Sequence, residues 1–173
     1  MNDLIVLAML ASGPKHGYQL KHEAGQITGQ EALHNNLIYP MLRRFTAAGW
    51  VMKKTAPGER GQTRQQYSLT KAGRQALLEE LIAYTEKDAD SQPAFVTRVG
   101  MFELLPSEDR GRILQVRERY LRSRQERLEG RAARMDIGYY GGEVLRFLRR
   151  QIRSELGWIS RMRSRRLREK HKV

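Results

Sequence analysis

The feature that most constrains the fold of this chain is a change of hydrophobic period between residues 35 and 70. Apolar residues recur at helical spacing over residues 35–48. Residues 50–55 are then typical of a strand, and residues 65, 67 and 69 alternate along a second strand. Between the two strands, residues 57–63 combine Pro and Gly with charged and polar side chains, which predicts a long polar turn. The pattern therefore predicts a helix followed directly by a β-hairpin.

Helices are predicted on both sides of this hairpin. Residues 4–10 are apolar on nearly every side, which is typical of a buried helix, and a second helix is expected from about Gly17. Thr70 is well placed to cap a fourth helix, because its hydroxyl can accept from the free amides of a first turn. Three helices, a basic hairpin and a further helix make a winged helix-turn-helix, so we expect a mainly α fold with a small β-hairpin wing in residues 1–86.

The chain from residue 92 to residue 173 is expected to form a helical dimerisation domain with a basic C-terminal tail. Helical spacing resumes after Pro93, a long helix is predicted from Ser107, and a turn is predicted at residues 138–142. The last helix carries an apolar seam with spacings of three and four residues, close to the pattern of a coiled coil. We expect this seam to join two copies of the chain in a homodimer. Its members are Leu145, Leu148, Ile152, Leu156, Ile159 and Met162.

The chain also has a strong excess of positive charge. It holds 32 Lys and Arg against 19 Asp and Glu, a net charge of +13, and such an excess favours a polyanionic partner. The excess is not concentrated in the wing domain, since 22 of the basic residues lie in residues 86–173. Many of these charges are expected to be solvated helix faces with pairs such as Arg122 and Glu126. For the Arg-rich tail, residues 161–172, two interpretations stay open: contact with phosphates or an unstructured end.

Several classes of function are disfavoured by what the sequence lacks. The absence of cysteine excludes disulfides, thiol catalysis and zinc ribbons, and the four histidines (His16, His22, His34, His171) have no ligand-like spacing, so no metal is expected. We find no nucleophile elbow, P-loop or paired-acid arrangement, and we expect neither an enzyme nor a cofactor. No apolar run reaches the length of a membrane span, and the first residues lack a positive leader, which favours a soluble cytoplasmic protein.

The winged-helix arrangement indicates which side chains would meet DNA. The third helix would present its polar face to base edges in the major groove, while basic residues beyond it and in the wing would meet phosphates. The candidate DNA-binding residues are His16, Tyr18, Asn35, Asn36, Tyr39, Arg43, Arg44, Arg60, Thr63 and Arg64. Alternatives stay open for three of these positions. Asn36 could act only as a helix cap, the Tyr39 ring could pack under its helix, and the turn around His16 could be purely structural.

Four blocks of the first half resemble the PadR family of bacterial transcriptional regulators. They are residues 13–20 (GPKHGYQL), 36–44 (NLIYPMLRR), 49–51 (GWV) and 64–74 (RQQYSLTKAGR), and together they cover roughly Met1 to Tyr84. The resemblance implies a DNA-binding winged helix followed by a helical C-terminal dimerisation region. It also implies repression of genes and, for some relatives, release by a small aromatic effector. An effector pocket is expected between the two parts, with ring faces from Trp50, Phe95, Phe102 and Trp158; the alternative is that both tryptophans belong to the core.

Three functions from different classes therefore stay open. The first is a dimeric, sequence-specific transcriptional regulator, most simply a repressor, that binds double-stranded DNA at a pseudo-palindromic operator and has no membrane partner. The second is a non-specific nucleic-acid-binding protein of the RNA-binding or nucleoid type, which the net charge favours. The third is a membrane-surface or protein-interaction module built on the last amphipathic helix. The four PadR-like blocks favour the first.

Overall fold

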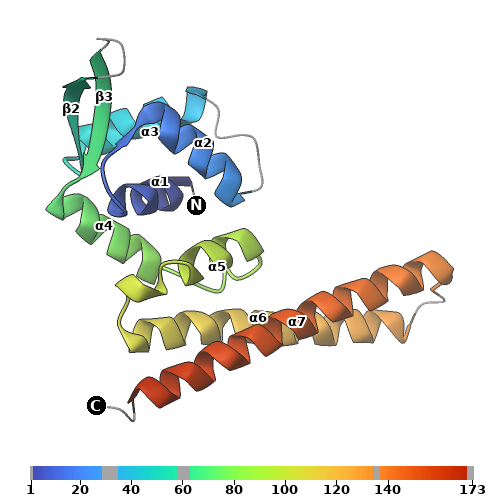
Figure 1. Cartoon of the computed structure of the whole chain (residues 1–173). Coiled ribbons are helices and arrows are strands. Elements are labelled where there is room, and N and C mark those ends of the chain that lie inside the picture. Colours follow the sequence, from blue (N-terminus) through green and yellow to red (C-terminus); the bar gives the residue numbers. More distant parts are fainter. Residues whose placement is uncertain (1, 29–34, 58–62, 135–136, 171–173) are drawn as a thin grey trace. The chain divides into compact units, whose positions relative to one another are not determined.

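A computed structural model describes residues 2–28, 35–57, 63–134 and 137–170 of the chain (Figure 1). The chain divides into two compact units, each described here by itself. The N-terminal unit comprises Met1–Ala83 and Val96–Leu104, and the C-terminal unit comprises Tyr84–Phe95 and Leu105–Val173. Within the described ranges, no helix combines the length and apolar character that a membrane span requires. The predicted domains 1–86 and 92–173 stay a prediction.

The N-terminal unit has the element order of a winged helix. Its elements are α1 (Asn2–Ala11), β1 (Lys15–His16), α2 (Gly17–Thr28), α3 (Asn35–Ala47), β2 (Val51–Pro57), β3 (Thr63–Leu69) and α4 (Lys71–Ile82). The strands form one antiparallel sheet in the order β1-β3-β2. Strands β2 and β3 make the hairpin seen in Figure 1, in which Val51 pairs with Leu69 and Pro57 with Thr63. The predicted fold class, mainly α with a small β wing, is confirmed.

Helix α1 lies at the centre of the N-terminal unit. Leu4, Ile5, Val6 and Leu7 are all buried, and α1 contacts α2, α4 and β3. A helix that is covered on every side needs no polar face, which explains the uniformly apolar sequence of residues 4–10. Around it, apolar residues of the other helices complete the core: Leu20, Ile38, Leu42, Phe45, Leu77 and Leu81.

The base of the wing is closed by Thr70, as the sequence predicts. Its side chain accepts a hydrogen bond from the Gly73 amide at 3.0 Å and donates to the Gly49 carbonyl at 2.7 Å, so it caps α4 and holds the start of β2. A Cβ atom on Gly73 would lie 2.0 Å from the Trp50 carbonyl oxygen, so only glycine fits there. The Trp50 ring packs on Phe45, with ring centroids 5.7 Å apart.

Strand β1 was not predicted. Its two residues follow Gly13, whose φ of 141° is readily adopted only by glycine, and they pair with the middle of β3: Lys15 with Tyr67, and His16 with Gln66. A two-residue strand has no periodicity that a sequence pattern could reveal. The pairing brings the start of α2 directly beside the wing.

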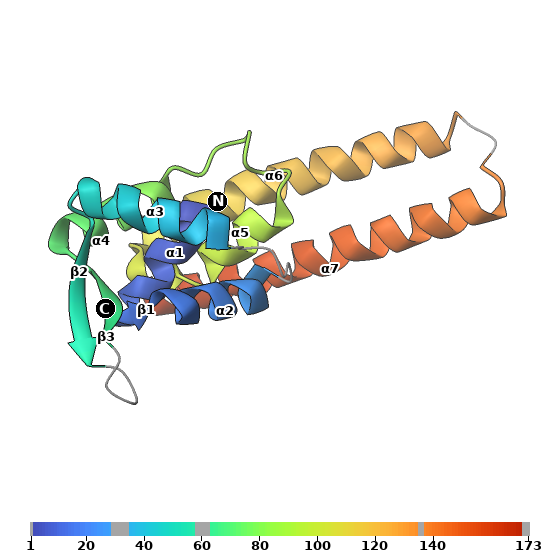
Figure 2. The same cartoon turned by 90° about the horizontal axis from the view of Figure 1, so that it is seen from above.

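The C-terminal unit is built on two long helices. Its elements are the first half of α5 (Gln92–Val99), α6 (Ser107–Ala132) and α7 (Tyr139–Lys170); the second half of α5 and a 3-10 helix at Phe102–Leu104 belong to the N-terminal unit. Helices α6 and α7 lie side by side and run antiparallel (Figures 1 and 2). Ile113, Leu114 and Leu121 of α6 are buried, as are Ile152 and Ile159 of α7.

Three expectations for the C-terminal unit need correction. Residues 139–142 of the predicted turn are helical, because α7 begins at Tyr139; packing along a 32-residue helix outweighs the low helix propensity of Gly141 and Gly142. The Arg122 guanidinium pairs with Glu118 at 2.7 Å rather than with Glu126. The tail is helical as far as Lys170, so the interpretation as an unstructured end is wrong up to that residue, and residues 171–173 lie outside the described part.

Candidate nucleic-acid interface

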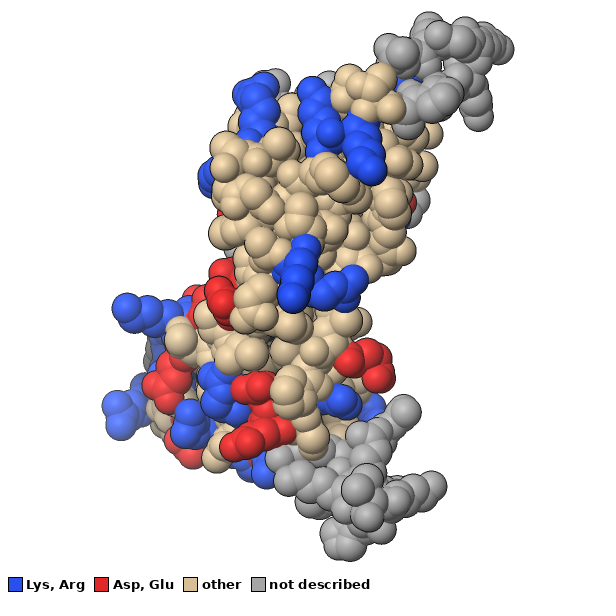
Figure 3. All heavy atoms as spheres, turned by 90° about the vertical axis from the view of Figure 1, so that its left-hand side faces the viewer, with Lys and Arg blue, Asp and Glu red and all other residues tan. Residues whose placement is uncertain are grey.

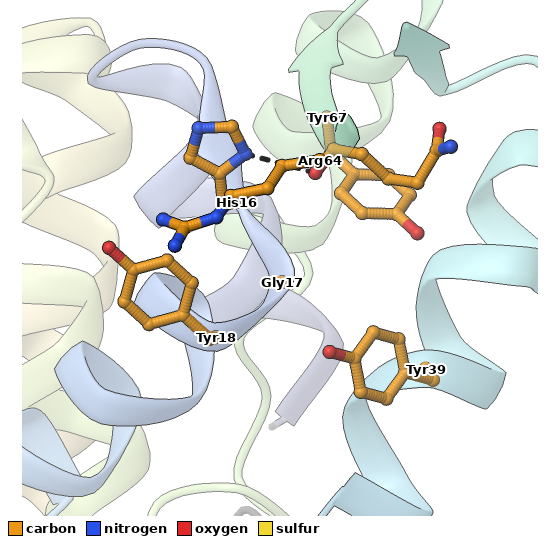
Figure 4. Close-up of a pocket in the computed structure, with 7 residues that line it drawn as sticks. His16, Gly17, Tyr18, Tyr39, Arg64 and Tyr67 are labelled. Atoms are coloured by element: carbon orange, nitrogen blue, oxygen red, sulfur yellow. Dashed lines mark hydrogen bonds between the residues drawn. The ribbon is translucent and has the colours of Figure 1, made fainter. Parts of the chain in front are cut away.

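A pocket of about 540 Å³ lies where the start of α2, α3 and β3 meet (Figure 4). We call it the tyrosine pocket; its lining residues are His16, Gly17, Tyr18, Tyr39, Arg64, Gln65 and Tyr67. Four of the predicted DNA-binding residues, from three separate sequence blocks, are therefore brought together. None of the seven lining residues is acidic, so the pocket favours an anion.

The rim of the pocket on the α2 side is organised by three side chains. The His16 ring nitrogen Nδ1 lies 3.1 Å from the Gln65 carbonyl oxygen, and because a carbonyl only accepts, Nδ1 carries the hydrogen. The His16 and Tyr18 rings are nearly parallel, with an interplanar angle of 9° and centroids 6.3 Å apart. The Arg64 guanidinium carbon lies 5.6 Å from the centre of the Tyr18 ring, a cation–π contact. Figure 4 shows the Arg64 side chain reaching from the wing towards Tyr18.

Tyr39 enters the pocket from α3. Its ring lies against the backbone of Gly17: a Cβ atom on that glycine would be 2.8 Å from Cε1 and 3.1 Å from the hydroxyl oxygen of Tyr39. The side chain is 40% exposed, so it does not pack under its helix as a core residue would. The hydroxyl is turned towards the first turn of α2 (Figure 4).

Tyr67 lines the pocket from β3 and was not predicted as a site residue. Burial raises the pKa of its hydroxyl above the ordinary value of 10.0; the nearby Tyr39 raises this pKa further and Arg43 lowers it. The hydroxyl is therefore a protonated donor at neutral pH. The alternation of β3 indicates only that Tyr67 faces inwards. Its place beside α2 depends on the pairing of Lys15 with Tyr67, which the sequence does not reveal.

The remaining candidates on α3 have different surroundings. Arg43 is exposed. Arg44 forms an ion pair with Asp3 of α1, and its guanidinium lies 5.4 Å from the centre of the Phe45 ring, so it fastens α3 to α1. Asn35 and Asn36 lie in the first turn of α3, and their side chains are outside the described part. Their predicted roles stay predictions.

The wing adds further positive charge. Lys53 and Lys54 are exposed on β2, and the charged side chains that Figure 3 shows on the upper part of the surface are mainly Lys and Arg. Thr63 begins β3 but its side chain lies outside the described part, as does the whole of Arg60. Among the described residues, no group of three or more His, Asp or Glu side chains could hold a metal ion.

Three helices, an antiparallel wing and a fourth helix define the N-terminal unit as a winged helix, a class of DNA-binding fold. Residues 6–79 match the sequence model of the transcriptional regulator PadR-like family. The chain therefore contains a PadR-like transcriptional regulator domain, as the sequence blocks predict. The members of this family are transcriptional regulators and not enzymes.

Solved structures similar to this chain include a putative transcriptional regulator from Thermoplasma acidophilum, with 27% identity, 60% of this chain and 88% of that chain covered, and a TM-score of 0.43. Bacillus subtilis PadR in complex with operator DNA has 17% identity, covers 95% of this chain and 98% of its own, and has a TM-score of 0.44. The structure of Bacillus subtilis PadR in complex with p-coumaric acid has 17% identity, covers 95% of this chain and 97% of its own, and has a TM-score of 0.43. Among curated proteins, none is similar to the chain.

The residues predicted for dimerisation and for an effector have different surroundings within their own units. Ile152 and Ile159 of the predicted seam are buried within the chain itself, and Leu145, Leu148, Leu156 and Met162 are half-buried. Phe95 and Trp158 pack edge to face in the C-terminal unit, with centroids 5.8 Å apart, whereas the Trp50 ring contacts Phe45. Phe102 is half-buried in the 3-10 helix. The effector pocket stays a prediction.

Proposed function

We propose that the protein is a dimeric, sequence-specific DNA-binding transcriptional regulator that acts as a repressor. The observation that carries the proposal is the tyrosine pocket, which joins Arg64 of the wing and Tyr39 of α3 at the start of α2. A cation and phenol hydroxyls without a neighbouring carboxylate suit a DNA phosphate, and phosphate contacts fix the orientation of a protein on the duplex. The PadR-like family match supports the same function.

In this mechanism α3 enters the major groove with its polar face outwards. Ile38, Leu42 and Phe45 hold the opposite face of α3 in the core. Asn36 then reads a base edge from the first turn, because its amide can both donate and accept, while Arg43 lies farther along the groove. The basic wing contacts the backbone or the adjacent minor groove.

Dimerisation follows from the small footprint of one winged helix, which contacts only a few base pairs. Helix α7 carries a stripe at alternating spacings of four and three, exposed except for the half-buried Trp158, which we call the outer stripe: Tyr140, Val144, Phe147, Gln151, Ser154 and Trp158. Tyr140, Val144 and Phe147 are 82%, 57% and 53% exposed, an unusual amount of apolar surface for a chain that acts alone. The outer stripe therefore replaces the buried seam as the proposed contact.

The outer stripe is complementary to itself. Its second half borders a groove of about 530 Å³, which is lined by α7 between Phe147 and Arg161 and by Gln92 of α5. In an antiparallel pair of α7 helices with a two-fold axis at Gln151, Val144 of each copy lies opposite Trp158 of the other, and Phe147 lies within one residue of the level of Ser154. The bulky half of one stripe then fills the grooved half of its partner, as a symmetric interface requires. Release by a small aromatic effector completes the proposal, with Phe95 and Trp158 as adjacent ring faces.

Affinity measurements on three nucleic acids test the proposal. Fluorescence anisotropy compares the DNA upstream of the protein's own gene, a scrambled duplex and an RNA duplex at roughly 50 and 150 mM salt. A regulator keeps a preference for one DNA site at the higher salt, since base contacts do not depend on counterion release. Equal binding to all three would support instead the non-specific nucleic-acid-binding protein that the net charge of +13 favours.

A further inference from the structure

The exposed surface of α7 carries positive charge without matching negative charge. The helix contains ten basic and three acidic residues, whereas α6 contains eight basic and five acidic residues. Glu155 is the only acid between residues 144 and 168, and it is buried in its pair with Arg117. The exposed side chains of α7 in this range therefore include no carboxylate.

Four arginines share one side of α7, and we call them the arginine face: Arg146, Arg149, Arg150 and Arg153. At roughly 100° per residue they fall within an arc of about 100°, and about 10 Å along the helix axis separates the first from the last. Arg149 is half-buried and the other three are exposed. The four guanidiniums therefore form one dense row of positive charge.

The chain itself neutralises little of this row. Hydrogen bonding from Arg146, and to a smaller extent the charge of Arg150, holds the pKa of the Glu143 carboxyl below its ordinary value of 4.5. Farther along, neither Arg149 nor Arg153 makes an ion pair with any of the described residues. The buried Nε of Arg149 has no hydrogen-bond partner among them. One carboxylate thus serves two of the arginines, and the other two have none.

The arginines of α6 have different surroundings. Arg122 is paired with Glu118 at 2.7 Å, an arrangement of the kind that stabilises a solvated helix face. In the second half of α6, Glu126 and Glu129 lie between the arginines along the sequence. Helix α6 therefore presents charges of both signs, whereas the arginine face presents one sign.

The side chains beyond the arginine face indicate which polyanion fits it. The same side of α7 continues from Arg153 with Gly157, Ser160 and Ser164, at spacings of four, three and four. A helix that lies on a membrane buries an apolar face next to its cations, but the apolar outer stripe is on another side of α7, in the proposed dimer contact. Small residues and hydroxyls suit a phosphate backbone instead, which guanidiniums bind with two parallel hydrogen bonds.

We propose that the arginine face is a second nucleic-acid-binding surface, which contacts the phosphate backbone of duplex DNA independently of its sequence. Its guanidiniums replace counterions along the backbone, and the release of those ions favours binding. The winged helix supplies the preference for one site, and α7 adds affinity for any duplex. This inference goes beyond the proposed function, because it requires no operator and no base contact.

Removing two charges from each long helix in turn tests the arginine face. We expect Arg146→Gln/Arg153→Gln to weaken binding to a scrambled duplex about tenfold at roughly 50 mM salt and to lower the salt slope by about two, as the loss of two phosphate contacts requires. The matched control is Arg127→Gln/Arg131→Gln, which removes the same charge from α6. None of the four residues belongs to the outer stripe or lines its groove, so both variants should keep the wild-type mass in light scattering. Equal losses of affinity in the two variants overturn the proposal.

The absence of cysteine from the chain allows a direct test of proximity. An iron–EDTA reagent attached to Ser160→Cys, next to the arginine face, is expected to cleave a bound duplex. The same reagent attached to Ser123→Cys, which replaces an exposed serine of α6, is the control and is expected to cleave much less. Cleavage from Ser160→Cys that does not exceed the control contradicts contact between α7 and DNA.

Two comparisons separate this surface from the alternatives. If Arg146→Gln/Arg153→Gln loses binding to phosphatidylglycerol vesicles and keeps its affinity for DNA, the arginine face serves a lipid surface and the proposal is wrong. In an Arg64→Ala background, the two α7 substitutions are expected to cause the same further loss as in the wild type, because distant contacts act additively. A wild type that prefers no DNA site contradicts the proposed function, whereas a selective loss in the α7 variant on the scrambled duplex would still support the arginine face.

Discussion

Arg117 and Glu155 form a bidentate ion pair in the interior of the C-terminal unit. Arg117 Nε lies 2.7 Å from Oε1 of the carboxylate, and the Nη2 nitrogen lies 3.0 Å from Oε2. Arg117 also donates to the Ala89 carbonyl and lies over the Phe95 and Tyr120 rings. One buried guanidinium thus joins α6, α7 and the segment that precedes α5.

Breaking this pair on one side is expected to be costly. Arg117→Met leaves a buried carboxylate without its cation and should lower the free energy of unfolding by about 3–5 kcal/mol in chemical denaturation. Arg122→Ala is the control: its pair with Glu118 is exposed on the Arg side, and the expected loss is about 1 kcal/mol or less. The double variant Arg117→Met/Glu155→Leu should recover part of the loss. Similar losses for Arg117→Met and Arg122→Ala would contradict this prediction.

Acid is expected to weaken the contact between α6 and α7 through Glu118. Hydrogen bonding from Arg122, followed by Arg163 of α7, holds the pKa of this carboxyl below its ordinary value of 4.5. A lowered folded-state pKa contributes stability above pH 4.5, and this contribution disappears as the pH falls through the folded value. The melting temperature of Glu118→Gln should therefore lie below that of the wild type at pH 7 and approach it near pH 3. A constant difference across this range argues against the assignment.

Asn36 and Arg64 are expected to respond differently to DNA sequence. Asn36→Ala should cost about 1–3 kcal/mol on the preferred site and little on a scrambled duplex, because a base contact carries sequence information. Arg64→Ala should weaken both and lower the salt slope by about one, as the loss of one phosphate contact requires. Titrations at two salt concentrations measure both effects. Full rescue by Asn36→Ser, together with a uniform loss in Asn36→Ala, would show that Asn36 only caps α3.

If the outer stripe is the dimer contact, a single carboxylate introduced into it should prevent dimerisation. Phe147→Glu should convert the dimer into a monomer in light scattering, because two carboxylates would be buried in a symmetric contact. Val96→Glu, which changes an apolar residue of α5 that is 46% exposed, is the control and should remain dimeric. A wild type that is monomeric at micromolar concentration excludes the dimer, and a dimeric Phe147→Glu excludes this stripe as its contact.

Local patterns were sufficient for most of the N-terminal unit. The apolar run of α1, the alternation of β3 and the capping position of Thr70 are each encoded within a few residues, so the sequence predicts them directly. The four predicted pocket residues were found in the same way, since polar side chains on short blocks stand out. Tyr67 was not, because the partner of a buried strand residue depends on a contact with β1, about 50 residues away.

The C-terminal unit shows what spacing alone does not decide. Helix α7 carries two stripes with nearly the same spacing, one around Ile152 and one around Phe147, and only the presence of α6 determines which is covered in a single chain. The more apolar stripe was predicted to join two copies, but Ile152 and Ile159 are buried within one. The more hydrophobic stripe is the buried one, as its sequence indicates. Hydrophobicity does not indicate whether the same chain or a second copy covers it.

The short pairing of β1 with β3 has a mechanical consequence for DNA binding. His16 is fixed to the wing twice, through its backbone pairing with Gln66 and through its ring bond to the Gln65 carbonyl. A movement of the base of the wing is therefore expected to move the first turn of α2 with it, because the two are held together as one unit. A duplex whose groove width displaces the wing would also displace the amides at Gly17. The affinity for DNA would then depend on base pairs that the protein does not contact, through their effect on the shape of the duplex.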